Sequence, residues 1–311
     1  MTTLATIDVG TNTVRLLIAT VVPGVAGWRT IHAEQRVTRL GEGAAATGEL
    51  GEAPAARTAA TVVEYVARAR AAGATRVAIV ATSAVREAAN GRAFAAELER
   101  ATGVAVRVIT GEDEARLTLA GVAAGLGPLH GVSVTFDIGG GSTEFILARD
   151  GALVRAASLR LGVVPLAERF PFPGPVDPAR YAVLRGQVQA RLDRELPVGF
   201  ASAHVETLVG TAGTVTTLAA LDLGLAEYDA DRVQGHTLTR TAIARQAERL
   251  RALDLAGRAA LPCLEPGRAD LIVPGVAIVE ATLASLGGDR LVVSDWGLRE
   301  GVLARLAAGE V

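Results

Sequence analysis

The fold of this chain is decided by the stretch Asp137-Ile138-Gly139-Gly140-Gly141-Ser142-Thr143-Glu144. An apolar run lies on each side of it, so the stretch predicts two strands joined by a turn made largely of glycine. Such a turn lets backbone N–H groups approach an anion closely, as in loops that hold phosphates. Asp137 and Glu144 are oxygen ligands suited to a Mg²⁺ ion that accompanies the phosphate. The alternative is a β-hairpin whose glycines only make the turn and whose acids are solvated.

Nearly the same pattern occurs earlier, in Asp8-Val9-Gly10-Thr11-Asn12-Thr13. This stretch also ends one apolar run and precedes another, which predicts a second strand–loop–strand unit. Two such loops in one chain favour two domains of related plan, with the phosphate loops facing each other across a cleft. Thr11, Asn12 and Thr13 are the candidate phosphate-binding residues of the first loop.

Composition limits the class of protein. The chain has 311 residues, enough for two domains with proper cores, and half of the residues are hydrophobic while 21% are charged, as in a globular protein. A formal net charge of −2 gives no support to nucleic-acid binding or to attachment on acidic membranes. The single cysteine, Cys263, excludes an internal disulfide and a multi-cysteine metal site. With no signal peptide or membrane span apparent, we expect a cytoplasmic protein.

Strand-like and helix-like segments alternate along the chain, which predicts an α/β fold with mixed sheets. We expect the first half to run βββ-α-β-α-β-α, with Asn90 capping one of its helices. The second half is expected to repeat this order with insertions. It includes a long helix after Asp177 and a late helix that opens at about Arg268. The hinge between the halves is expected near Gly125–Gly131.

Three acids, Glu112, Asp113 and Glu114, stand at a predicted helix start. Acids in a first helical turn favour the helix dipole, and a capping box of Asp113 with Thr110 is the alternative to catalysis. Successive helical residues point about 100° apart, so only one or two of the three can face the cleft. A carboxylate there, near a metal-bound phosphate, would orient and deprotonate a water molecule.

A second anion site is predicted in Gly210-Thr211-Ala212-Gly213-Thr214, where a strand enters a helix, because helix N-termini bind anions. A tight turn with a threonine cap is the alternative. Three arginines are weaker candidates for phosphate contacts, and a surface role is the alternative for each: Arg15, Arg86 and Arg268.

Together these residues resemble the exopolyphosphatase and guanosine pentaphosphate phosphatase family. It belongs to the superfamily of acetate and sugar kinases, heat-shock chaperones and actin. The Gly-Glu-Asp-Glu-Ala-Arg piece before the Asp-Ile-Gly-Gly-Gly-Ser-Thr-Glu piece is more specific than the glycine loops alone. The matching segments run nearly the whole chain: Asp8–Leu16, Arg39–Gly43, Ala81–Ala88, Thr110–Arg116, Asp137–Glu144, Gly210–Leu218 and Val293–Leu303.

The resemblance implies two actin-like (ribonuclease H-like) domains with mixed sheets and the active site in the cleft between them. Domain I would span residues 1–124 and domain II residues 125–297. The C-terminal helix, about residues 298–311, would pack back on domain I.

The resemblance also implies roles for individual residues. Glu114 matches the catalytic glutamate that activates the attacking water, while Asp137 and Glu144 match acids of the metal and phosphate site. Asp8 matches the acid of the first loop and is the further metal ligand. Arg15 and Arg86 would contact phosphates further along the substrate. The matching phosphate-loop positions are Gly139, Gly140, Gly141 and Ser142, with Gly210, Thr211, Gly213 and Thr214.

The reaction implied is in-line attack of water on the terminal phosphoryl group of inorganic polyphosphate. The metal would be Mg²⁺, with Mn²⁺ as an alternative. Longer family members carry further C-terminal domains and this sequence stops after the two-domain core, so we expect short-chain polyphosphate as substrate. A homodimer is left open.

Three other functions compete. Hydrolysis of guanosine pentaphosphate would use the same acids within the same family. A sugar or acetate kinase would share the loops but would take ATP and has no need of Glu114 as a water activator. A nucleotide-gated binding protein of the actin or chaperone kind is disfavoured because the chain lacks a substrate-binding extension.

Overall fold

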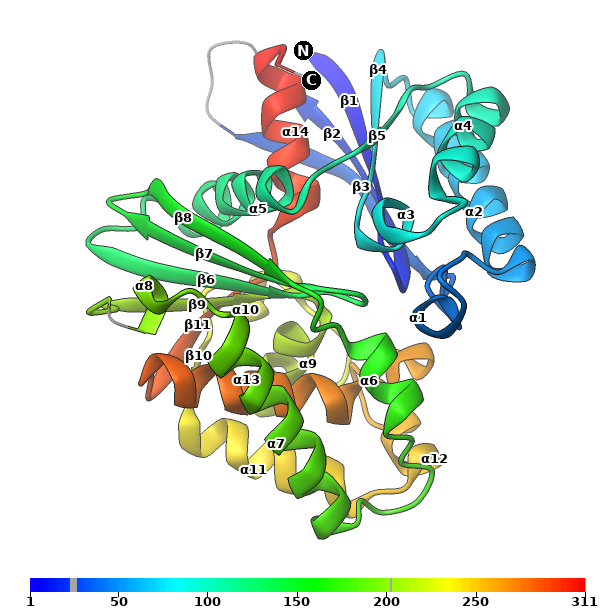
Figure 1. Cartoon of the computed structure of the whole chain (residues 1–311). Coiled ribbons are helices and arrows are strands. Elements are labelled where there is room, and N and C mark those ends of the chain that lie inside the picture. Colours follow the sequence, from blue (N-terminus) through cyan, green and yellow to red (C-terminus); the bar gives the residue numbers. More distant parts are fainter. Residues whose placement is uncertain (23–26, 202, 311) are drawn as a thin grey trace. The chain divides into compact units, whose positions relative to one another are not determined.

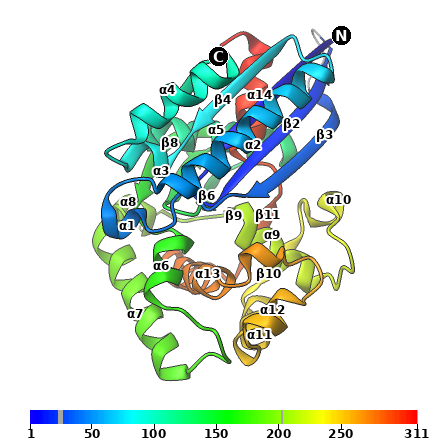
Figure 2. The same ribbon diagram turned by 90° about the vertical axis from the view of Figure 1, so that its right-hand side faces the viewer.

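The computed structural model describes residues 1–22, 27–201 and 203–310 (Figures 1 and 2). The chain forms two compact units. Unit 1 comprises Met1–Ala124 and Trp296–Val311, and unit 2 comprises Gly125–Asp295. The domain limits expected from the sequence differ from these only at the second junction, which was placed after residue 297. Val311, the end of the expected C-terminal helix, lies outside the described residues.

Unit 1 is built on a five-stranded sheet of order β3-β2-β1-β4-β5. β1 pairs antiparallel with β2 and parallel with β4, so the sheet is mixed. The strands are β1 (Thr2–Val9), β2 (Thr13–Val21), β3 (Trp28–Val37), β4 (Arg76–Ala81) and β5 (Val106–Val108). The helices are α1 (Ala44–Thr47), α2 (Glu52–Ala71), α3 (Ser83–Glu87), α4 (Gly91–Thr102), α5 (Gly111–Leu126) and α14 (Leu298–Ala308).

The apolar side chains of β1 are buried on both faces of this sheet, because successive strand residues point to opposite sides. Ile7 joins a buried cluster with residues of α2 and α4, whereas Leu4 joins a second cluster with residues of α14. Figure 2 shows α2 and α4 in front of the sheet and α14 behind it. The two tryptophans of the chain, Trp28 and Trp296, stack in this unit with ring centroids 4.8 Å apart. Tryptophan fluorescence therefore reports on unit 1 alone.

Unit 2 is built on a six-stranded mixed sheet of order β10-β11-β9-β6-β7-β8. Its strands are β6 (Val132–Ile138), β7 (Thr143–Arg149), β8 (Ala152–Leu159), β9 (Thr207–Thr211), β10 (Thr237–Thr239) and β11 (Arg290–Ser294). Its helices are α6 (Val163–Arg169), α7 (Pro178–Glu195), α8 (Val198–Ala201), α9 (Ala212–Asp222), α10 (Ala230–Val233), α11 (Arg240–Ala252), α12 (Leu255–Ala259), the 3₁₀ turn Pro266–Arg268 and α13 (Ile272–Leu286). Asp177 caps α7 as predicted, since its carboxylate accepts from Arg180 N.

The predicted α/β class with mixed sheets is confirmed, but two local predictions are wrong. The Asn90 side chain does not cap α4; its amide bonds Leu50 N at 2.8 Å and Leu50 O at 2.9 Å, so it ties down the chain before α2. Arg268 does not open a long helix. Its segment forms tight i to i+3 bonds, and α13 begins only at Ile272. Among residues 1–22, 27–201 and 203–310, no helix has the length and apolar character needed to cross a bilayer.

A network of charges joins β3 to α2. Glu34 accepts from Arg36 Nη2 at 3.3 Å and also from Arg68, while Arg36 Nη1 bonds Glu64 at 2.6 Å. Burial alone would raise the pKa of the Glu34 carboxyl, but the His32 hydrogen bond and the Arg68 and Arg36 charges hold that pKa below its ordinary value. Glu34 therefore stabilises the fold when ionised.

We expect Glu34→Gln to lower the stability of unit 1 most at neutral pH. Because the folded pKa lies below the unfolded one, the contribution is complete above the ordinary glutamate pKa of about 4.3 and is lost as pH falls through the lowered value. Urea denaturation followed by tryptophan fluorescence at pH 7, 5 and 3 measures this. A difference between variant and wild type that stays the same at pH 3 and pH 7 would contradict it.

Candidate active site

The glycine loop of unit 1 joins β1 to β2 as a tight turn. Gly10 N donates to Thr13 O at 3.1 Å, and the backbone N–H groups of residues 38, 39 and 41 donate to the carbonyls of Asn12 and Thr11 at 2.8–3.0 Å. The side chains of Thr11, Asn12 and Thr13 are buried. The segment after β3 therefore fixes this loop by hydrogen bonds to the loop carbonyls.

The glycine loop of unit 2 is built in the same way. Gly139 N donates to Ser142 O at 2.9 Å, and the first N–H groups of α6, from Val163 and Val164, donate to the carbonyls of Gly139 and Gly140 at 3.2 and 2.9 Å. With these carbonyls engaged, the groups that such a loop offers to an anion are its N–H groups. Both loops thus share one construction.

A row of polar side chains crosses the sheet of unit 2 at the end of β6, where the glycine loop begins. Asp137 lies opposite Glu144 on β7 and opposite Thr211 on β9. The row continues to Ser158 on β8 and to Ser294 on β11. Residues paired in register share a face of the sheet, so these side chains lie side by side.

The centre of this row is suited to a cation. Glu144 is 1% exposed and accepts from Ser158 Oγ at 2.7 Å, and its cross-strand neighbour Asp137 is a second carboxylate. Like charges directly opposite destabilise a sheet unless a positive charge compensates them. No group of three or more acids, histidines or cysteines that could hold a metal occurs in the described part of the chain. Mg²⁺ usually takes one or two carboxylates and completes its shell with water and phosphate, so the pair fits it.

Asp8 is the last but one residue of β1 in unit 1, where it lies opposite Arg15 on β2. Its side chain is 7% exposed. The register therefore places the predicted metal ligand and the predicted phosphate-binding arginine next to each other.

The first turn of α5 separates the three acids as helix geometry requires. Glu112 is exposed and pairs with Arg116. Asp113 makes only half of the predicted capping box: its N–H donates to Thr110 Oγ1 at 3.1 Å, but its carboxylate accepts from the Thr110 hydroxyl at 2.8 Å and not from the Thr110 N–H. Only Glu114 is buried, with 8% of the residue exposed.

Glu114 is held by an arginine from another element. Arg86 Nη1 on α3 donates to Glu114 Oε2 at 3.0 Å and to the carbonyl of Ile109 at 2.9 Å. The structure thus brings two predicted site residues of unit 1 together, and no motif in the sequence pairs them.

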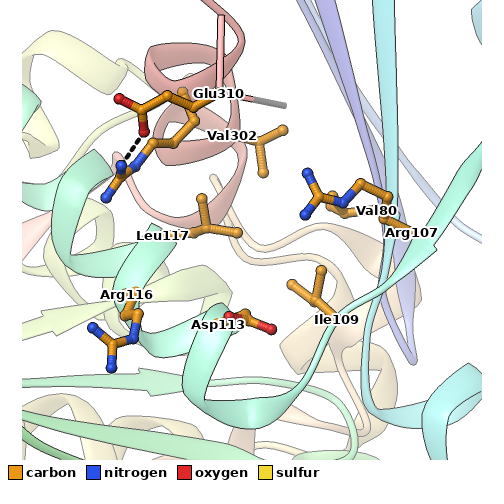
Figure 3. Close-up of a pocket in the computed structure, with 9 residues that line it drawn as sticks. Val80, Arg107, Ile109, Asp113, Arg116, Leu117, Val302 and Glu310 are labelled. Atoms are coloured by element: carbon orange, nitrogen blue, oxygen red, sulfur yellow. Dashed lines mark hydrogen bonds and ion pairs between the residues drawn. The ribbon is translucent and has the colours of Figure 1, made fainter. Parts of the chain in front are cut away.

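A cavity of about 180 Å³ lies in unit 1. Figure 3 shows Asp113 and Arg107 at its rim and Leu117 and Val302 beside it. Asp113 is the one candidate acid that lines it. The residues that line it are Val80, Arg107, Ile109, Asp113, Arg116, Leu117, Val302, Arg305 and Glu310.

The second predicted anion site lies at the junction of β9 and α9. The Arg268 guanidinium lies directly on Gly213, where a Cβ would overlap Nη1 and lie 2.8 Å from the guanidinium carbon. Arg268 Nε also pairs with Glu265 at 3.2 Å. Thr214 packs on Gly275 of α13 in the same manner. The structure therefore places the Arg268 guanidinium at the start of α9, although the two are far apart in the sequence.

Known proteins resemble this chain along its whole length. A model of the Ppx/GppA phosphatase family matches residues 17–310. Exopolyphosphatase 2 of Mycobacterium tuberculosis is 36% identical over 321 residues, covering 99% of each protein. The crystal structure of the Aquifex aeolicus member of the Ppx/GppA family matches with a TM-score of 0.83 and 34% identity, covering 99% of this chain and 98% of that one. An exopolyphosphatase from Cytophaga hutchinsonii matches with a TM-score of 0.91 and 26% identity, over 99% and 98% of the chains. These likenesses confirm the predicted α/β fold class of two actin-like domains.

Proposed function

The chain belongs to the Ppx/GppA phosphatase family and is a hydrolase, and on that premise we propose that it is an exopolyphosphatase. It would remove the terminal phosphoryl group of inorganic polyphosphate and release orthophosphate. The observation that carries the proposal is the carboxylate pair Asp137 and Glu144 beside the glycine loop at residues 139–142. Its full-length similarity to a protein named exopolyphosphatase favours polyphosphate as the substrate.

The proposed reaction is hydrolysis of a phosphoanhydride. Glu114 would orient a water molecule and accept its proton, while the water oxygen bonds to the terminal phosphorus. The bridging P–O bond breaks, and the shortened chain leaves with the electron pair. The loop N–H groups, with Arg15 and Arg268, would bind the phosphoryl oxygens as negative charge shifts on them. The positive charge of Arg268 at the start of α9 supports its part in this role.

Asp137 and Glu144 would hold Mg²⁺, and Asp8 of unit 1 is the further ligand expected from the sequence. The ion, when bound, supplies positive charge to the phosphoryl oxygens. We further propose a cytoplasmic protein without nucleic-acid or membrane partners. Mn²⁺ is the alternative to Mg²⁺, and a homodimer stays open.

Phosphate release tests the function directly. Purified protein with Mg²⁺ is given short polyphosphate, long polyphosphate, guanosine pentaphosphate and ATP in parallel. We expect one-at-a-time release from polyphosphate, and fastest release from the short chain. A preference for guanosine pentaphosphate would transfer the proposal to that substrate. Release from none of the four would overturn it.

Removal of divalent metal should abolish phosphate release. We expect EDTA to stop the reaction and excess Mg²⁺ to restore it, because the paired carboxylates alone would repel the polyanion. Asp137→Asn should raise the Mg²⁺ concentration needed for half-maximal activity, since one charged ligand is lost. Asp150→Asn, at the far end of the β7–β8 hairpin, is the matched control and should not change it. Undiminished activity in EDTA would contradict the metal proposal.

A further inference from the structure

The helix α3 places one arginine between two carboxylates. Arg86 Nη1 donates to Glu114 Oε2 at 3.0 Å, and Arg86 Nη2 lies 4.0 Å from Glu87 Oε1. Glu87 is itself fixed by the hydroxyl of Ser83 at 3.0 Å. The Arg86 side chain is 22% exposed and that of Glu114 is 10% exposed, so the contact is largely removed from water.

We propose that Arg86 is a positioning residue for Glu114 rather than a ligand of the polyphosphate chain. This inference rests on the proposed function, because it takes Glu114 to be the group that activates water. It changes the role that the sequence resemblance gave to Arg86.

Charge favours the positioning role. Within the cluster of Arg86, Glu87 and Glu114, one positive charge faces two negative charges. The Arg86 guanidinium is thus already engaged by two carboxylates of its own unit. A phosphate group would have to compete with both of them for that guanidinium. The arrangement is that of a carboxylate held by a charge-assisted hydrogen bond.

The geometry shows how the positioning works. Arg86 Nη1 bridges the Ile109 carbonyl and the Glu114 carboxylate, and Glu114 N donates to Thr110 O at 2.9 Å in the first turn of α5. The guanidinium is therefore anchored to the same segment that starts the helix. A glutamate side chain has several rotamers, and this bridge selects one of them. In the proposed reaction Oε2 stays on Arg86, and Oε1 is the atom that accepts the proton from water.

The kinetic test measures kcat and KM for polyphosphate separately. Small misplacements of a catalytic group cost on the order of 100-fold in rate, so we expect Arg86→Gln to lower kcat by about that factor. KM should change little, since the chain is bound elsewhere. Arg86→Lys, or guanidinium added to Arg86→Ala, should recover part of the kcat. Arg116→Gln, which removes an arginine from the exposed face of α5, is the control and should match wild type.

A second test does not depend on activity. Arg86→Gln, Glu114→Gln and the double variant are unfolded in urea, with the tryptophan stack of unit 1 as the probe. Because the two side chains share one contact, the midpoint shift of the double variant should be smaller than the sum of the single shifts.

Two results would overturn the inference. One is a raised KM with unchanged kcat in Arg86→Gln, which is the behaviour of a phosphate ligand. The other is additive midpoint shifts, which would mean that the two side chains do not act on each other. If wild type released no phosphate from polyphosphate, the proposed function and the catalytic role of the pair would fall together. The urea experiment would then still decide whether the contact exists.

Discussion

Glu114→Gln is expected to lower kcat for polyphosphate hydrolysis by roughly 10²- to 10⁴-fold, the usual contribution of a general base. The amide has the shape of the carboxylate and keeps an oxygen that can accept from Arg86, but it cannot take a proton from water. We therefore expect the variant to fold and to bind polyphosphate while releasing almost no phosphate. Steady-state kinetics and a urea denaturation curve for the same preparation measure both properties.

The same turn of α5 supplies the matched controls. Asp113→Asn alters a capping side chain and Glu112→Gln alters an exposed ion pair, so each changes one acid without changing the buried one. Asp113→Asn should lower stability by about 1 kcal/mol or less, and both variants should keep kcat near wild type. A loss of activity in all three variants would show that the negative charge of the turn matters, rather than Glu114 itself. Near wild-type activity in Glu114→Gln would remove its assigned role.

Long periodic elements were predictable from the sequence. In the helix α2 (Glu52–Ala71), Pro54 lies near the start and Gly73 lies past the end, and these two residues mark the limits of a helix in the sequence. Strand β1 (Thr2–Val9) and the glycine loop after it were predictable for a similar reason: an apolar run ends where the polar and glycine residues begin.

Short elements carried no such signal, and one of them matters for the site. α3 (Ser83–Glu87) has five residues, fewer than two turns, so no period can be recognised in it. The sequence named Arg86 and Glu114 separately but gave no means to see that α3 brings the guanidinium to the start of α5. Contacts between side chains far apart in the sequence are set by packing.

The partner of Glu144 was missed because of a bulge. Between Leu147 and Ala148 the register of β7 against β8 shifts by one residue. A regular hairpin would place Ala157 opposite Glu144, and the bulge places Ser158 there instead. An alternating pattern in the sequence does not reveal one extra residue in a strand, so the hydroxyl that binds the buried carboxylate appears only in the structure.

Gly301→Ala is expected to destabilise unit 1 by about 2 kcal/mol. α14 crosses α5 at two glycines, and a Cβ at Gly301 would overlap the carbonyl oxygen of Leu117 and lie 2.6 Å from the carbonyl carbon. A Cβ at Gly121 would likewise overlap the carbonyl oxygen of Gly297. The obstacle is backbone, so no side-chain rotation relieves it and the helices must separate. Overpacking usually costs 1–3 kcal/mol, and more where backbone must move, while alanine returns about 1 kcal/mol of helix propensity.

At Gly186 in unit 2, the same substitution to alanine is expected to stabilise the protein. Gly186 lies in the middle of α7, with nothing within 4 Å of the position of a Cβ, so Gly186→Ala should stabilise unit 2 by about 1 kcal/mol. Urea unfolding followed by tryptophan fluorescence reads unit 1, and circular dichroism reads both units. Gly301→Ala should lower the fluorescence midpoint, whereas Gly186→Ala should leave it in place. A raised fluorescence midpoint in Gly301→Ala would contradict the close approach of Gly301 to the Leu117 carbonyl.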